Sequence, residues 1–216
     1  MFRKLFSFCT FLGLIGFQLS CSTTKNGILN KEYHTLTTKY NVLFNGKEAF
    51  AIGESILAQA FEDNFYELLP VEPINLQGEN FDETTIVPGF DRAEEKAVKA
   101  IQKHSIKINE EQYNRKIDEA YLLLGKARYF DRRFFPALEA FNFLLESGAK
   151  PRIFIEGKIW REKTNIRLRN IELAIENLEP LASSLSPESK FYPLANATLA
   201  EAFIQLQEMD SAATYI

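Results

Sequence analysis

Residues 124–151 read LGKARYFDRRFFPALEAFNFLLESGAKP, and two helices joined by a short turn account for the pattern. Small residues stand at Gly125, Ala127 and Ala137, where they would let two helices approach closely. The larger Phe141 and Leu144 follow at helical spacing and are expected to fill the gap to the next helical hairpin. Gly148 followed by Pro151 is a typical helix stop.

The same pattern returns later in the chain. Leu199-Ala200-Glu201-Ala202-Phe203 repeats the first helix, and Ala212 follows Ala202 at the distance that separates Ala137 from Ala127. Between the two units lies a degenerate one, whose second helix is marked by Ala174, Leu178 and Leu181. Its first helix, around residues 155–166, is charged and is expected to lack the small residues of the other two units. Ala137, Ala174 and Ala212 are 37 and 38 residues apart.

Helical hairpins that recur about every 34 residues are typical of tetratricopeptide repeats. We therefore expect an all-α fold in which residues 91–216 form helical hairpins of a TPR-like superhelical solenoid that continues beyond Ile216. The alternative is an irregular helical bundle that uses Ala and Leu at helical spacing.

The N-terminal half predicts one more hairpin and one irregular insertion. Residues 33–44 and 47–64 have helical periodicity, and Asn45-Gly46 should break them into a hairpin spanning residues 33–68. The inward faces are expected to carry a set of apolar residues: Tyr33, Leu36, Tyr40, Leu43, Phe44, Phe50, Ile56, Leu57, Ala60 and Phe61. Residues 69–90 contain three prolines and two glycines, and predict a long irregular loop.

Three short stretches of sequence resemble helix starts. Asp91 with Glu94 fits a capping box, and Asn109 with Gln112 fits a similar cap. Residues 186–188, Ser-Pro-Glu, place proline at a first helical position.

The first residues predict export and a lipid anchor. Arg3 and Lys4 precede an apolar run over residues 5–19, which is shorter than the roughly 20 residues of a membrane-spanning helix. Residues 18–21, Gln-Leu-Ser-Cys, resemble a lipobox, so residues 1–20 are expected to be a lipoprotein signal peptide and Cys21 the lipid attachment site. Residues 21–32 would then be a flexible tether. A plain secreted protein cut near this point is the alternative.

The sequence predicts no catalytic, cofactor or metal site. The net charge of −4 argues against nucleic-acid binding, which requires a basic face. His34 and His104 have no partner at metal-ligand spacing and are interpreted as packed or surface residues. Trp160, the single tryptophan, is expected in the core. We therefore expect a protein-binding scaffold rather than an enzyme.

One block of residues carries a family resemblance. The pattern Y-H-x-x-T-x-x-Y-N-x-x-F-N is matched by seven residues: Tyr33, His34, Thr37, Tyr40, Asn41, Phe44 and Asn45. Together with the lipobox, the insertion and the repeats, it resembles the N-terminal part of the PorW/SprE gliding-motility lipoproteins of the type IX secretion system. The resemblance implies a scaffold on the periplasmic face of the outer membrane, lipid-anchored at Cys21, that links secretion ring components to the outer-membrane translocon.

Two other lipoprotein classes stay open as alternatives. An outer-membrane assembly lipoprotein of the BamD type also combines a lipobox with such hairpins. A SusD-like glycan-binding lipoprotein would use helical repeats to carry a sugar site.

Overall fold

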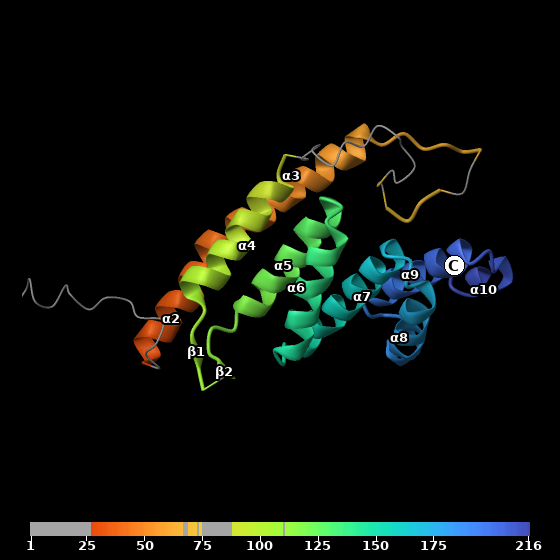
Figure 1. Cartoon of the computed structure of the whole chain (residues 1–216). Coiled ribbons are helices and arrows are strands. Elements are labelled where there is room, and N and C mark those ends of the chain that lie inside the picture. Colours follow the sequence, from red (N-terminus) through yellow and green to blue (C-terminus); the bar gives the residue numbers. More distant parts are fainter. Residues whose placement is uncertain (1–26, 67–68, 73, 75–87, 110) are drawn as a thin grey trace, which may run out of the picture.

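The computed structural model describes residues 27–66, 69–72, 74, 88–109 and 111–216, and their architecture is all-α (Figure 1). The signal peptide and Cys21 lie outside these residues. In chain order the elements are α2 (Ile28–Thr37), the π-helix η1 (Thr38–Leu43), α3 (Phe44–Ala60), α4 (Phe90–His104), β1 (Lys107–Ile108), β2 (Glu111–Gln112), α5 (Ile117–Phe130), α6 (Phe134–Glu146), α7 (Pro151–Arg167), α8 (Ile171–Ser184), α9 (Tyr192–Gln205) and α10 (Met209–Ala213).

The predicted N-terminal hairpin over residues 33–68 is wrong. The helix runs without a break from Ile28 to Ala60, so Asn45-Gly46 makes no turn. Gly46 serves a close approach instead, because a Cβ there would lie 2.9 Å from Leu123 Cδ2 and 3.1 Å from Lys96 Cβ. Residues 28–32 are helical as well, so the predicted tether is too long at that end, and residues 21–26 lie outside the described part.

The face predicted to be inward on this helix is also partly wrong. Tyr33, Leu36, Tyr40, Phe44, Ile56 and Ala60 are exposed, whereas Leu43 and Phe50 are buried as predicted. Besides these two, the side that packs carries residues that were not predicted: His34, Thr38, Val42, Gly46, Ala49 and Gly53. Apolar residues lie along two neighbouring sides of this helix. Helix α4, whose buried face carries alanines, packs against only one of these sides. The exposed side remains on the outside.

The irregular insertion begins earlier than predicted, at Phe61, and ends at Gly89. Residues 67–68, 73 and 75–87 lie outside the described part, whereas Glu72 and Ile74 are buried against the helices. Gly89 has φ 114°, and a Cβ there would lie 2.5 Å from the Ala49 carbonyl oxygen. This position therefore requires glycine, and α4 begins from it.

None of the three predicted caps is formed, although α4 begins at Phe90, one residue before the start predicted at Asp91. Gly89 precedes α4 without a side-chain cap, and Glu94 pairs with Arg128 and Arg133 rather than reaching back. Asn109 has φ 50° in the turn between β1 and β2, and the next helix begins only at Ile117. The Ser-Pro-Glu segment at 186–188 precedes further turn residues, since α9 begins at Tyr192. Helices α4, α5 and α9 therefore all begin without a side-chain cap.

The three predicted hairpins, by contrast, are present as α5–α6, α7–α8 and α9–α10, each closed by the same turn. The residue two positions after each first helix has a left-handed backbone: Arg132 at φ 61°, Arg169 at 66° and Gln207 at 63°. Each turn repeats one set of backbone hydrogen bonds, of which the third joins Arg133 N to Arg128 O, Asn170 N to Asn165 O and Glu208 N to Phe203 O. The helical repeat is thus visible in the backbone as well as in the side chains.

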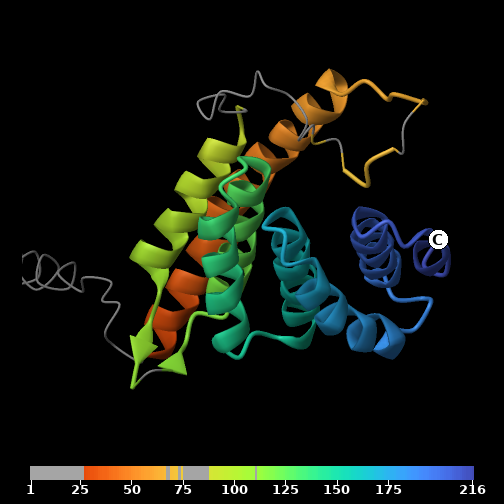
Figure 2. The same cartoon turned by 45° about the vertical axis from the view of Figure 1, so that its right-hand side comes forward.

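The hairpins stack in chain order (Figure 2). First helices α5, α7 and α9 contact one another in sequence, and we call the side they form the first-helix face. Gly125 accommodates Phe141, as a Cβ there would lie 2.4 Å from the ring. Gly157 similarly accommodates Leu144, so the first helix of the degenerate unit does contain a small residue, contrary to the prediction. A superhelical course of the stack stays a prediction.

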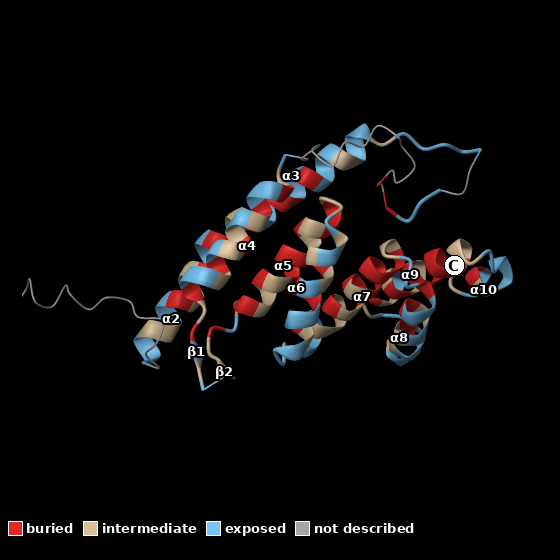
Figure 3. Ribbon diagram, in the orientation of Figure 1, coloured by how far each residue is buried: buried red, intermediate tan, exposed pale blue. Residues whose placement is uncertain are grey.

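Helix α7 separates two parts of the core. Trp160 packs into the cluster that runs from α3 to α6, whereas Ile159 packs into the cluster shared with α8, α9 and α10. The buried strip therefore runs along the whole stack, as Figure 3 shows in red. The core position predicted for Trp160 is confirmed, with the residue 5% exposed.

Candidate functional site

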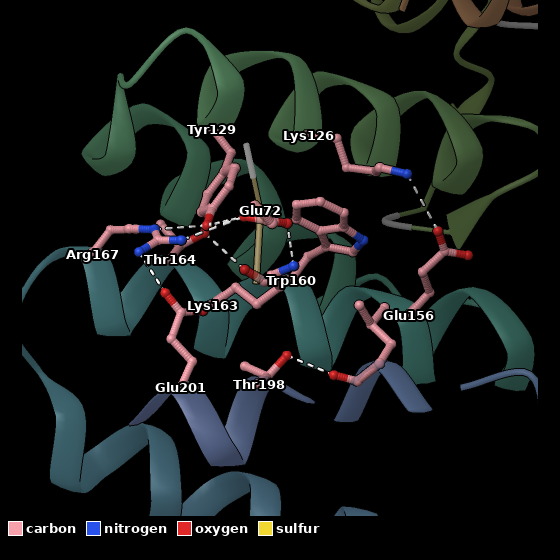
Figure 4. Close-up of polar contacts among 11 residues, drawn as sticks. Glu72, Lys126, Tyr129, Glu156, Trp160, Lys163, Thr164, Arg167, Thr198 and Glu201 are labelled. Atoms are coloured by element: carbon pink, nitrogen blue, oxygen red, sulfur yellow. Dashed lines mark hydrogen bonds and ion pairs between the residues drawn. The ribbon is translucent and has the colours of Figure 1, made fainter. Parts of the chain in front are cut away.

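A buried polar cluster lies on the first-helix face, where α5, α7 and α9 meet the insertion (Figure 4). We call it the first-helix cluster, and it consists of Glu72, Tyr129, Trp160, Lys163, Arg167 and Glu201. All but Glu72 come from first helices of the three hairpins. The repeat thus brings equivalent helices together, and the polar side chains converge between them.

Helical spacing explains the arrangement on α7. Trp160, Lys163 and Arg167 are three and four residues apart, so they stand on one side of the helix. Lys163 has a side chain only 1% exposed and Arg167 one of 5%. Cations this deeply buried require partners, because an unpaired buried charge is strongly unfavourable.

The carboxylate of Glu72 supplies the central partner. Lys163 Nζ forms an ion pair with Glu72 Oε1, and the Tyr129 hydroxyl donates to Glu72 Oε2 at 2.7 Å. Arg167 Nη2 lies 3.5 Å from the same Oε2. One carboxylate is therefore surrounded by three donors from α5 and α7.

Arg167 contacts residues of both neighbouring first helices, α5 and α9. Its Nε donates to the Tyr129 hydroxyl at 2.9 Å, and its Nη1 pairs with Glu201 Oε1 of α9 at 2.6 Å. Lys163 Nζ lies 4.5 Å from the centroid of the Trp160 ring, within the range of a cation–π contact. Residues of α5, α7 and α9 therefore contact the two cations in addition to Glu72 of the insertion.

The charges of the cluster are paired with one another. Two cations face two carboxylates, so the cluster is formally balanced. Burial, and then the negative charge of Glu72, raise the pKa of Tyr129 well above its usual value, which keeps the phenol neutral and able to donate. Burial also raises the pKa of Glu201, against the opposing effect of Arg167.

The two histidines contact each other, with His34 on α2 and His104 on α4. The sequence did not predict this contact. His34 Nδ1 and His104 Nδ1 are 3.0 Å apart, and both residues are buried, in line with the packed alternative. Asn114 closes the same contact, since its amide donates to Thr38 Oγ1 and to the His104 carbonyl. Within the part of the chain that the structure describes, no group of three or more potential metal ligands occurs.

Sequence reasoning missed the first-helix cluster. Lys163 lies in the charged helix around residues 155–166 and Glu72 in the irregular loop predicted over residues 69–90, and neither was predicted as a site residue. The spacing of Trp160, Lys163 and Arg167 was an available signal, whereas the position of Glu72 depends on how the insertion folds back. The predicted lipid site, Cys21, lies outside the described residues.

No protein-family model matches the chain, and no curated protein matches it either. Over the residues described, no helix is both long and apolar enough to span a bilayer.

Proposed function

We propose that this chain is a scaffold lipoprotein on the periplasmic face of the outer membrane, which binds protein partners through its helical repeats. The observation that carries the proposal is the first-helix face itself. Stacked hairpins there gather a peptide segment and hold its carboxylate with three donors. Stacked repeats commonly use such extended faces to bind other proteins.

The lipid anchor of the proposal rests on the N-terminal sequence. Helix α2 begins at Ile28, seven residues after Cys21, so a lipid on Cys21 would hold the helical stack close to the membrane. Acylation also explains a cysteine that would be the only one left after removal of residues 1–20.

The partners we propose are the ring components and the outer-membrane translocon of the type IX secretion system. Support comes from the motif that resembles the PorW/SprE lipoproteins. Three of its residues, Tyr33, Tyr40 and Phe44, are exposed along one side of the N-terminal helix, where a partner can reach them. Core packing of these three therefore does not account for the motif.

Affinity isolation from detergent-solubilised envelopes of the source organism tests this assignment. The tagged full-length chain should recover secretion ring or translocon proteins, and a Tyr33→Ala/Tyr40→Ala variant should recover less of them. A Glu172→Gln variant, altered at an exposed site on α8, is the matched control and should behave like the unaltered chain. Recovery of sugar-uptake barrels alone, or of outer-membrane assembly components alone, would contradict the assignment in favour of the corresponding alternative.

A further inference from the structure

We propose that Tyr129, Lys163 and Arg167 form a receptor for an acidic side chain in an extended segment of a partner protein, and that Glu72 occupies this receptor as an internal ligand. The inference rests on the proposed function and names the chemistry of the partner. An incoming acidic segment would bind by displacing Glu72 from the first-helix cluster.

The receptor is built by the helices rather than by the insertion. Tyr129 lies on α5, Lys163 and Arg167 lie on α7, and these helices pack directly on each other. Arg167 is held from both sides, by the Tyr129 hydroxyl at 2.9 Å and by Glu201 at 2.6 Å. The positions of the donors therefore depend little on which carboxylate they bind.

Among the described residues 69–72 and 74, side chains rather than backbone hydrogen bonds hold the segment to the helices. Among the described residues of segment 69–74, the backbone hydrogen bonding is limited to one contact within the segment, from Ile74 N to Glu72 O at 2.7 Å. Among the described residues of the segment, the side chains of Glu72 and Ile74 are buried, with Ile74 6% exposed in the core. A competing segment would replace the contacts of these two side chains.

Exchange of one carboxylate for another is electrostatically balanced. Without the Glu72 carboxylate, Arg167 would keep its ion pair with Glu201, whereas Lys163 would lose its ion pair and remain as an uncompensated buried cation. With a partner carboxylate in place, the donors keep their ion pair and hydrogen bond. The receptor thus favours ligands with an acidic residue and disfavours the corresponding amide.

The internal ligand also defines the probe. Residues 69–76 read LPVEPINL, with an acidic residue followed two positions later by an aliphatic one. A synthetic peptide of this sequence, added to the full chain, mimics a partner segment. The same peptide with glutamine in place of the glutamate, LPVQPINL, is the matched control.

Binding of the labelled peptide is measured by fluorescence polarisation to the unaltered chain and to a Glu72→Ala/Ile74→Ala variant. The tethered segment has a high effective concentration, so its removal should tighten binding by at least about tenfold. The glutamine peptide should bind the variant at least about tenfold more weakly, and adding Lys163→Met should abolish the difference between the peptides. Equal affinity for both chains, or for both peptides, would overturn the proposal.

A second measurement applies if the double variant does not fold. Trp160 is the only tryptophan and contacts Lys163, so its fluorescence reports on the receptor of the unaltered chain. Millimolar LPVEPINL should change this fluorescence saturably and LPVQPINL should not; no difference between the peptides overturns the proposal. If the peptides fail but affinity isolation recovers secretion components, only the receptor falls. If the peptides bind but isolation fails, the partner assignment falls.

Discussion

Gly125 lies where α5 meets α6, and the missing side chain makes room for a phenylalanine ring. A Cβ at this position would lie 2.4 Å from Phe141 Cε1, and Phe141 itself is fully buried. Gly125→Ala should therefore destabilise the fold by about 1–3 kcal/mol through overpacking, although alanine is the better helix former. Urea denaturation followed by circular dichroism measures the change.

A compensating substitution is the control for this prediction. Phe141→Leu removes the ring that the new Cβ would meet. Gly125→Ala should therefore lower the free energy of unfolding less in the Phe141→Leu background than in the unaltered chain. An unchanged or higher stability of Gly125→Ala alone would contradict the packing argument.

The histidine pair predicts a dependence of stability on pH. Burial lowers the pKa of His34, and burial, followed by His34 and Lys99, lowers the pKa of His104. The unfolded chain therefore binds more protons than the folded chain below about pH 6.5, the ordinary histidine value. Stability from the neutral pair should be complete above about pH 6.5 and should be lost as the pH falls below it.

Urea denaturation at pH 7.5 and pH 5.5 measures this loss. A His34→Gln/His104→Gln double variant is the control, because it cannot take up these protons. The unaltered chain should lose more stability between the two pH values than the double variant. The same loss in both chains would show that other groups cause the pH dependence.

At the scale of helices and turns, the three equivalent turn residues with positive φ allow the shared turn geometry to be tested. Gln207 has φ 63°, a conformation that is unfavourable by about 1–2 kcal/mol for a residue with a Cβ and is open to glycine. Gln207→Gly should stabilise the last hairpin by about 0.5–1 kcal/mol, measured by urea denaturation.

A substitution two residues earlier is the matched control. Gln205 is the last residue of α9, so Gln205→Gly should destabilise the hairpin or leave it unchanged. Stabilisation by Gln205→Gly and destabilisation by Gln207→Gly would contradict the shared turn geometry.

The same scale shows what the sequence could predict and why the rest failed. The α5–α6 hairpin was predictable because its small residues and aromatic ring lie within one local unit. Gly46 was misread as a turn, because a glycine needed for close helix packing and a glycine needed for a turn have the same local sequence pattern. The contact of Glu72 with Lys163 spans 91 residues, and no local rule reports a segment that folds back that far.

At the scale of the whole molecule, the proposed lipid on Cys21 predicts that this residue is required for membrane attachment. Cys21→Ala should move the protein from the membrane fraction to the soluble fraction and abolish incorporation of labelled palmitate, because the lipid would have no attachment site. Cys9→Ala, within the apolar run of the signal, should leave both unchanged. Cell fractionation with immunoblotting measures both variants, and membrane retention of Cys21→Ala would contradict the anchor.

Partner binding through the first-helix face is tested most directly by site-specific photo-cross-linking in living cells of the source organism. Glu156 of α7 lies beside Lys126 on the first-helix face, at 3.7 Å, whereas Glu172 of α8 is exposed elsewhere on the stack. A photoreactive residue at position 156 should cross-link to a secretion ring or translocon protein, and one at position 172 should not. Cross-links to such proteins from position 172 alone, or only to proteins unrelated to secretion, would contradict the account.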